Sequence, residues 1–215
     1  MSAASFDWFP DWSRDICILI AGGPSAKDAP LDRVRGHARV LVVNEGYRLA
    51  PWADALYAAD AHWWEKKGGC KEFKGLRISQ SDQAAKMYGG IREVGLIRVG
   101  GIVTNPKGAL GAGSDGNGTG ANSGFQALNL AVQFGARKIV LVGYDMTIDH
   151  GVHWHGPHER GLNNPTSHGI ARWRRVLDTA AKQLDALNVK VINASAISAL
   201  TAFPKMGLEQ ALESF

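Results

Sequence analysis

Short runs of apolar residues recur along this chain, and most of them end at glycine or at a polar residue. Several of the runs are rich in valine and isoleucine and are apolar throughout instead of alternating with polar positions. Strands that are buried on both faces of a parallel sheet have this pattern. The runs predict strands at residues 16–21, 40–43, 55–58, 76–79, 96–99, 139–142 and 189–192.

Apolar residues at helical spacing predict two helices between the last three of these strands. Residues 122–134 repeat phenylalanine, leucine and valine at that spacing, and Gly135 follows as a stop signal. Residues 168–187 carry a longer apolar stripe, in which Trp173 is assigned to packing. The arginines beside that stripe, Arg172 among them, are assigned to a solvated helix face.

Strands that alternate with helices in this way indicate the fold class. The chain is predicted to be an α/β protein, a single Rossmann-like three-layer α/β/α domain with a mostly parallel sheet and right-handed crossovers. The domain covers residues 1–215, with an N-terminal arm at 1–14 and a C-terminal packing tail at 198–215. A glycine-rich segment at 99–120 is predicted to be a mobile loop over or beside a site, because uncovered linkers of this length are unusual inside a compact domain.

The composition is that of a folded chain and excludes extended disorder. Of the 215 residues, 45% are hydrophobic and 20% are charged, and the formal net charge is only +4. This mild positive excess leaves DNA open as a partner and does not require it. The two cysteines have neither metal-site nor redox-pair spacing, which favours a reducing compartment. Because no leader-like start and no run of about 18 apolar residues is found, no membrane span is expected and the chain is predicted to be cytoplasmic.

Glycine makes up 26 of the 215 residues, and one cluster follows the first predicted strand. Gly22, Gly23, Pro24 and Ser25 form a tight turn where that strand ends. In open α/β sheets ligands bind outside the carboxyl ends of the strands, and glycine lets the backbone approach a phosphate or ribose closely. The turn matches neither the dinucleotide motif G-x-G-x-x-G nor the phosphate-binding motif that ends in G-K-S/T. We interpret it as a nucleotide-binding turn, with an ordinary strand-to-helix turn as the alternative.

The next two predicted strands also end in polar residues. Asn44 follows the second strand, where its amide can bind the edge of a base or a sugar. Asp60 follows the third strand. Because the carboxyl ends of parallel strands meet at one edge of the sheet, these residues are predicted to share a site with the glycine turn.

A second glycine cluster comes directly before the helix predicted at 122–134. It contains Thr119, Gly120, Asn122 and Ser123. The N–H groups at the start of a helix carry positive partial charge, and the hydroxyl groups of this cluster add hydrogen-bond donors. We assign these residues to phosphate binding, with plain capping of the helix as the alternative.

Gly143, Tyr144 and Asp145 follow the strand predicted at 139–142. The first two are assigned to the nucleotide site because they lie at the same edge of the predicted sheet. Asp145 lies where α/β enzymes commonly place a catalytic carboxylate. We assign it to orienting a ribose or an acceptor.

Five of the seven histidines come after Asp145, between positions 150 and 168. Interleaved glycines and a proline predict a loop there. His153 and His155 are candidates for a catalytic acid or base because imidazole titrates near neutral pH. The loop could also bind a divalent metal together with Asp145 or Glu159, but no zinc-binding helix motif or cysteine partner is present, so the ligand set is unknown.

These motifs together resemble the shared core of two related groups of proteins. One group is the bacterial sialyltransferases that use a CMP-activated sugar, and the other is the MptE-like pterin diphosphokinase and motility-accessory group. The residues that carry the resemblance are 20–25, 43–44, 119–124 and 142–145.

A longer set of matches resembles a family of phage and prophage proteins of the morphogenetic ("norphogenetic") type. This resemblance spans nearly the whole chain. Its pieces are residues 43–44, 50–54, 59–64, 122–124, 153–155 and 198–200.

The resemblance implies a Rossmann-like sheet that holds a nucleotide across residues 22–25, Asn44 and residues 119–123. In the sialyltransferases a histidine serves as the general base and no metal is strictly required. His153 and His155 are the matching candidates here. A diphosphokinase-like activity would instead imply a magnesium site, for which Asp60, Asp145 and the histidines could supply ligands.

Three functions follow from the residues and the resemblance. The first is a phage- or prophage-encoded, nucleotide-dependent transferase of the glycosyltransferase type, with a CMP- or UDP-sugar as donor and a glycan, DNA or protein as acceptor. The second is a non-catalytic phage accessory or assembly protein on the same fold. The third is a metal-dependent phosphotransferase or hydrolase that uses the histidine loop. Assembly of the chain into a homo-oligomer is left open.

Overall fold

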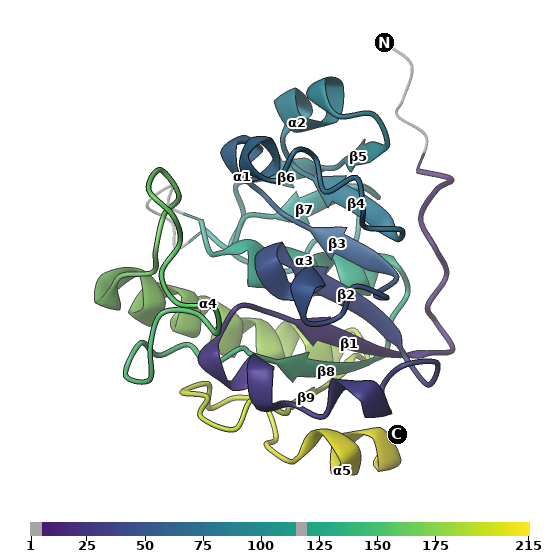
Figure 1. The fold of residues 1–215 in the computed structure, drawn as a ribbon. Coiled ribbons are helices and arrows are strands. Elements are labelled where there is room, and N and C mark those ends of the chain that lie inside the picture. The colour runs from purple at the N-terminus through teal and green to yellow at the C-terminus, as the bar shows by residue number, and fades with distance from the viewer. Residues whose placement is uncertain (1–5, 115–119) are drawn as a thin grey trace.

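The computed structural model of this protein describes residues 6–114 and 120–215. A seven-stranded sheet with the strand order β5-β4-β3-β2-β1-β8-β9 forms its centre (Figure 1). All neighbouring strands in it are parallel, which confirms the predicted α/β fold with a mostly parallel sheet. The strands are β1 (Ile16–Ile20), β2 (Arg39–Val43), β3 (Ala55–Tyr57), β4 (Leu76–Ser79), β5 (Ile91–Glu93), β8 (Lys138–Val142) and β9 (Lys190–Asn193).

The apolar runs form central strands because both faces of the sheet are covered. Successive side chains of a strand point to opposite faces. In β1, Leu19 packs into the hydrophobic cluster on one face and Ile18 into the cluster on the other, and both are fully buried. A strand in this position needs apolar residues at every step, which is the pattern seen along the chain.

Helices cover the two faces in separate groups, so that the molecule has three layers (Figure 1). One face packs against α3 (Ser123–Gln133) and α4 (Ser167–Ala186). The other face packs against shorter helices and 3-10 turns. These are η1 (Pro24–Asp28), η2 (Leu31–Arg33), α1 (Ala61–Lys66), α2 (Asp82–Met87) and α5 (Leu208–Glu213).

The strand predicted at 96–99 does not join the main sheet. It forms β6 (Gly95–Ile97), which pairs in parallel with β7 (Ala109–Gly111) in a separate two-stranded sheet. The apolar run alone could not reveal this, because a short strand at the margin has the same composition as one in the main sheet.

The glycine-rich segment at 99–120 is held in place along its described part. The Asn129 side chain of α3 is fully buried and accepts hydrogen bonds from the N–H groups of Val103 (3.0 Å) and Gly111 (2.7 Å). The Gln183 side chain of α4 accepts another from Ile102 (2.7 Å). Residues 99–114 therefore pack against α3 and α4, and none of them lines the cavity described below.

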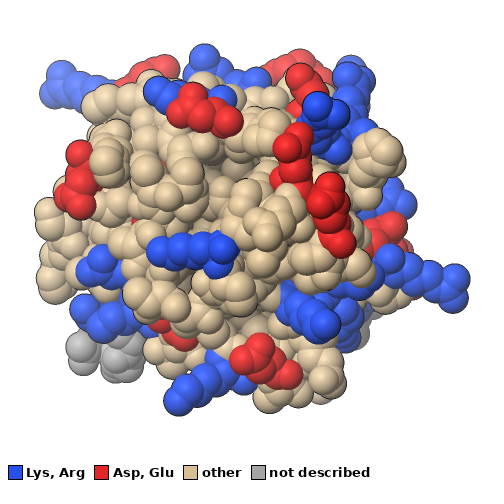
Figure 2. Space-filling model, turned by 90° about the horizontal axis from the view of Figure 1, so that it is seen from below, with Lys and Arg blue, Asp and Glu red and all other residues tan. Residues whose placement is uncertain are grey.

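The C-terminal segment contributes to the hydrophobic core. Leu200, Phe203 and Leu208 are all buried. Figure 2 looks onto the end of the molecule that carries α5, and it shows basic and acidic side chains intermingled on this face. Arg33 and Glu209 form one such pair, at 3.3 Å. Within the described ranges, none of the helices combines the length and the apolar content needed to cross a bilayer.

Candidate functional site

A cavity of about 500 Å³ opens beyond the carboxyl ends of β1, β2, β3 and β8. The order of the strands reverses here: the chain passes from β1 to β2 on one side, whereas β8 lies on the other side of β1. Open α/β sheets bind their ligands at such a switch point. Ligand pockets commonly measure about 300–1,000 Å³, so this cavity has the size of a binding site.

Most of the residues predicted to form a site come together in this cavity. Four predicted residues do not line the cavity. Pro24 and Ser25 belong to the turn after β1, and the other two are Gly120 and Tyr144. Thr119 lies outside the described residues. The predicted residues that line the cavity are Gly22, Gly23, Asn44, Asp60, Asn122, Ser123, Gly143, Asp145, His153 and His155.

Asp145 ties the end of β8 to the turn after β1. Its side chain accepts one hydrogen bond from the Ser25 N–H (2.8 Å) and a short one from the Ser25 hydroxyl. Burial raises the pKa of Asp145 above its ordinary value, and the two bonds from Ser25 partly offset this effect. Both carboxylate oxygens thus accept hydrogen bonds from Ser25, and Asp145 holds the turn after β1 against the end of β8.

Gly23 is required where this turn meets the end of β8. A Cβ atom on Gly23 would lie 2.6 Å from the Oδ2 atom of Asp145 and still closer to the Gly143 carbonyl oxygen. Gly143 itself has a φ of 70°, in the left-handed region that favours glycine. The two glycines let the backbones of the two strand ends pass close together below the cavity.

Tyr144 does not line the cavity but supports its wall from behind. Its side chain is fully buried, and its hydroxyl donates a hydrogen bond to the Gly124 carbonyl (3.0 Å). Gly124 lies in the first turn of α3. Tyr144 therefore fixes the start of α3 against the end of β8, where both border the cavity.

Two helices begin at the cavity. Asn122 caps α3, with its side-chain oxygen accepting from the Phe125 N–H (3.0 Å), and both Asn122 and Ser123 line the cavity. Thr166 caps α4 in the same way by accepting from the Gly169 N–H (3.1 Å), and it also lines the cavity. Helix N-termini carry positive partial charge, so the cavity receives it from two directions.

Two residues without glycine's freedom have left-handed backbone at the cavity edge. The φ of Asn44 is 49°, and the φ of Met146 is also 49°. Asparagine adopts this conformation more readily than most residues, whereas methionine does so rarely. Such backbone strain concentrates at functional sites.

Three histidines of the loop after β8 lie against one another on the cavity wall. The ring centroids of His153 and His155 are 5.1 Å apart, and the two ring planes are nearly parallel. The ring centroid of His158 lies 4.3 Å from that of His153 and 5.0 Å from that of His155. Burial lowers the pKa of all three, and the neighbouring imidazoles lower those of His153 and His155 further. The pKa of His153 falls to about 4. The ring of His153 is therefore neutral at pH 7.

Glu45 is a buried carboxylate beside these histidines. Burial raises its pKa, but the hydrogen bond and charge of Lys67, together with smaller contributions that include the charge of Arg48, outweigh burial and leave the pKa below its ordinary value. Its Oε1 atom lies 2.9 Å from the Lys67 ammonium. Its Oε2 atom is buried without a hydrogen bond, and Arg48 lies 3.6 Å from it.

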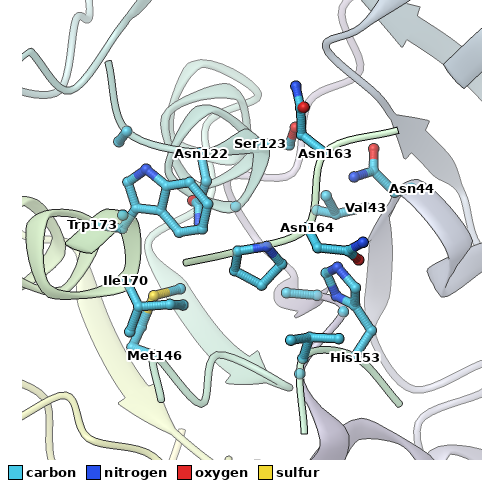
Figure 3. Close-up of a pocket in the computed structure, with 18 of the residues that line it drawn as sticks. Val43, Asn44, Asn122, Ser123, Met146, His153, Asn163, Asn164, Ile170 and Trp173 are labelled. Carbon is cyan, nitrogen blue, oxygen red and sulfur yellow. The ribbon is translucent and has the colours of Figure 1, made fainter. Parts of the chain in front are cut away.

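Several residues of the cavity were not predicted from the sequence. Figure 3 shows Met146, Ile170 and Trp173 as an apolar side of the cavity, and Asn44, Asn164 and His153 on the opposite side. Arg172, assigned to a solvated helix face, lines the cavity with a buried Nε atom that has no hydrogen bond to the described residues. Trp173, assigned to packing, likewise lines it with a buried, unbonded ring N–H.

The comparison with known proteins gives a relationship in fold. No protein-family model matches this chain, and no curated protein matches it in sequence. Structures of the sialyltransferase CstII from Campylobacter jejuni do match it. The fold is similar to that of a sialyltransferase. The match to CstII in complex with the substrate analogue CMP-3FNeuAc has a TM-score of 0.58 at 13% identity and covers 90% of this chain and 86% of that one.

A second CstII structure, in complex with cytidine-5'-monophosphate, matches to a similar extent. Its TM-score is 0.59 at 14% identity, and the match covers 93% of this chain and 87% of that one. Identity at this level establishes the shared fold alone.

Proposed function

We propose that this protein is a nucleotide-dependent transferase of the glycosyltransferase type, which transfers a sugar from a nucleotide-sugar donor. One observation carries the proposal. The glycine turn after β1 and the N-termini of α3 and α4 converge on one cavity at the switch point of the sheet. Backbone N–H groups and positive helix ends favour a phosphate at this place. CstII, with a similar fold, was determined with CMP and with a CMP-sugar analogue.

The polar groups around this anion site suit a nucleoside and a sugar. Asn44, Asn122 and Asn164 present amides to the cavity, and each amide can both donate and accept hydrogen bonds. Trp173 and Ile170 provide an apolar surface on the α4 side. A pocket that is partly apolar, with a few convergent polar groups, is the usual form of a small-molecule site.

The histidine loop supplies a base for the transfer. In the proposed step the acceptor oxygen forms a bond to the anomeric carbon of the sugar, and the bond from that carbon to the phosphate oxygen breaks. The nucleotide phosphate leaves with the electron pair, beside the positive ends of α3 and α4. The acceptor proton passes to an imidazole of the loop.

His155 is the better of the two predicted bases. A general base works best when its pKa lies near the working pH. The pKa of His153 falls to about 4 because the ring is buried and lies against two other imidazoles. His153 therefore holds a proton too weakly to act efficiently at pH 7, and we assign the proton transfer to His155.

Calorimetric titration with CMP, UDP, GDP and ATP tests the proposal, in EDTA and again with Mg²⁺. We expect one molecule of CMP to bind per chain in EDTA, and UDP is the second candidate ligand. Release of the nucleotide from the matching nucleotide-sugar, followed by chromatography, tests turnover. If none of the four nucleotides binds under either condition, the proposal is wrong.

A pair of asparagine variants makes the binding test specific. Asn44→Ala removes an amide from the cavity, and we expect it to weaken CMP binding about tenfold, the value of one hydrogen bond. Asn188 also has left-handed backbone, with a φ of 55°, but it follows α4 and does not line the cavity. Asn188→Ala therefore reproduces the backbone cost of the substitution, and CMP affinity should stay at the wild-type value.

A further inference from the structure

Three imidazoles lie close together on the cavity wall. His153, His155 and His158 each offer a ring nitrogen, and these three nitrogens all lie within 4.8 Å of one another. In residues 6–114 and 120–215, no other three or more histidine, cysteine, aspartate or glutamate side chains lie this close. The three come from a single H-x-H-x-x-H segment.

His153 forms a hydrogen bond with the Gly22 backbone, and its other polar ring atom is left unpaired. The Nε2 atom of His153 is buried and has no hydrogen-bond partner among the described residues. Burying a polar atom in this way is unfavourable unless something pairs with it.

The backbone holds the three rings in place. The Trp154 N–H donates to the Gly22 carbonyl (3.0 Å), which ties the middle of the segment to the turn after β1. The Gly156 N–H donates to the His153 carbonyl (3.1 Å), and the His158 N–H donates to the Asn164 side chain (2.8 Å). The imidazoles thus approach one another on a segment that is tied to the turn after β1 and closed by two local hydrogen bonds.

We propose that His153, His155 and His158 form a binding site for a divalent transition-metal ion, with zinc as the preferred ion. Neutral imidazole is a ligand for zinc, cobalt, nickel and copper, whereas magnesium and calcium prefer oxygen. Three protein ligands on a cavity wall leave a fourth coordination position open toward the cavity. Zinc sites in which a substrate or a water binds have this form.

The present distances are compatible with such a site. Zinc lies about 2.05 Å from an imidazole nitrogen, which places tetrahedral ligands about 3.3 Å from one another. The three nitrogens, at up to 4.8 Å, would have to move closer together, and the stacked rings of His153 and His155 would have to turn so that both face the ion. The buried carboxylate of Glu45 acts electrostatically on all three rings and would balance part of the charge of the ion.

The metal site shares His155 with the proposed sugar transfer, but the two proposals can be tested separately. A coordinated imidazole cannot accept a proton, so an ion here would replace the base role assigned to His155. An oxygen bound to the ion would instead lose its proton to water, because zinc lowers the pKa of a bound water to about 7. Nucleotide binding in EDTA tests the proposed function, and metal binding without nucleotide tests this inference.

The experiment uses the full chain purified without a histidine tag and treated with EDTA, which is then removed. Titration with Zn²⁺ is followed by calorimetry, and titration with Co²⁺ by visible absorption, which reports the coordination geometry. We expect one ion per chain, a tetrahedral Co²⁺ spectrum, and no competition from excess Mg²⁺. A rise in melting temperature with Zn²⁺ should accompany binding, because an ion that binds only the folded chain stabilises it.

Variants locate the ion. His153→Ala, His155→Ala and His158→Ala should each weaken Zn²⁺ binding at least tenfold, and His158→Gln gives a second variant that keeps the volume of the side chain. His150→Ala, in the same loop, and His168→Ala, on the same cavity wall, should bind Zn²⁺ as the wild type does. Circular dichroism in EDTA verifies that each variant is folded.

Two results would overturn the inference. One is a wild-type chain that takes up no Zn²⁺ at about 50 μM protein and equimolar metal. This concentration lies far above the dissociation constant expected for such a site. The other is one-to-one binding that survives all three cluster substitutions and disappears in the His150 or His168 variant, which would place the ion elsewhere.

Discussion

Replacing Ser25 by alanine tests whether the Ser25–Asp145 contact holds the site together. The variant loses the hydroxyl bond to Asp145 but keeps the backbone N–H bond at 2.8 Å. Asp145 is only 1% exposed, so water cannot readily replace the lost donor. A hydrogen bond to a charged group contributes about 1.5–3 kcal/mol, and we expect the free energy of unfolding at pH 7 to fall by about 2 kcal/mol. For a chain of this length the melting temperature should fall by about 4–8 °C.

The loss should shrink as the pH is lowered. Burial already raises the pKa of Asp145, and the Ser25 hydroxyl lowers it, so the variant has a still higher pKa in the folded state. A carboxyl whose pKa is raised by folding binds its proton more tightly when folded, and its destabilising effect disappears as pH falls through that pKa. Below the folded-state pKa values of both proteins, only a neutral hydrogen bond of about 1 kcal/mol separates them.

Urea denaturation from pH 4 to pH 8 measures both effects, and Asp145→Asn provides the matched background. In that background Ser25→Ala should cost about 1 kcal/mol at every pH, because the amide carries no charge. A loss below about 0.5 kcal/mol at pH 7 would refute the reasoning. So would a loss that grows toward acid pH or one that is equal in the two backgrounds.

Three further predictions follow from the geometry. Gly23→Ala should destabilise the fold by about 3 kcal/mol in urea denaturation, because its Cβ would lie 2.6 Å from Asp145, whereas Gly207→Ala, with open space around it, should stay within about 0.5 kcal/mol. Asn129→Ala should cost about 3 kcal/mol, because it leaves two backbone N–H groups without their acceptor, and hydrogen exchange of residues 103 and 111 should accelerate. The metal-free wild type should lose stability relative to His153→Gln as pH falls from about 6.5 to about 4, because the pKa of this ring is about 4 in the folded chain and the unfolded chain binds the proton first. The difference in the free energy of unfolding should change by up to about 1.4 kcal/mol per pH unit. Equal pH profiles of the two proteins would contradict this prediction.

The main sheet and the two long helices could be predicted closely because their causes are local. Each central strand is buried on both faces, so its run of apolar residues marks it directly. The helix predicted at 122–134 occupies Ser123–Gln133, and the one predicted at 168–187 occupies Ser167–Ala186. Both begin at a capping side chain, Asn122 and Thr166, that is visible in the sequence.

The smaller elements could not be predicted because they are too short to show a period. The helices α1, α2 and α5 have six residues each, less than two turns. The strand β5 has three residues, two of them exposed and charged, so its pattern does not differ from that of a loop. Their positions depend on contacts with the sheet, which a local pattern does not contain.

The positions of the site residues at strand ends could be predicted from the sequence, whereas the contacts between their side chains could not. Gly22, Asn44 and Asn122 follow or precede recognisable elements, and parallel strands bring such positions to one edge of the sheet. Arg172 and Trp173 escaped prediction because a helix has several faces, and the sequence does not say which one borders a cavity. The start of α4 at this cavity is a product of tertiary packing.

The sequence by itself determined the parallel sheet and the edge of it at which polar and glycine residues gather, because burial on two faces and the direction of parallel strands leave a local record in residue type. Only the tertiary structure decided which of those residues are free to meet a ligand. Asp145 is engaged by Ser25, 120 positions away, whereas His153, His155 and His158 bring one ring nitrogen each to within 4.8 Å of the others. A hydrogen bond or a shared ligand site depends on distances of a few ångströms between side chains, and these follow from how the elements pack.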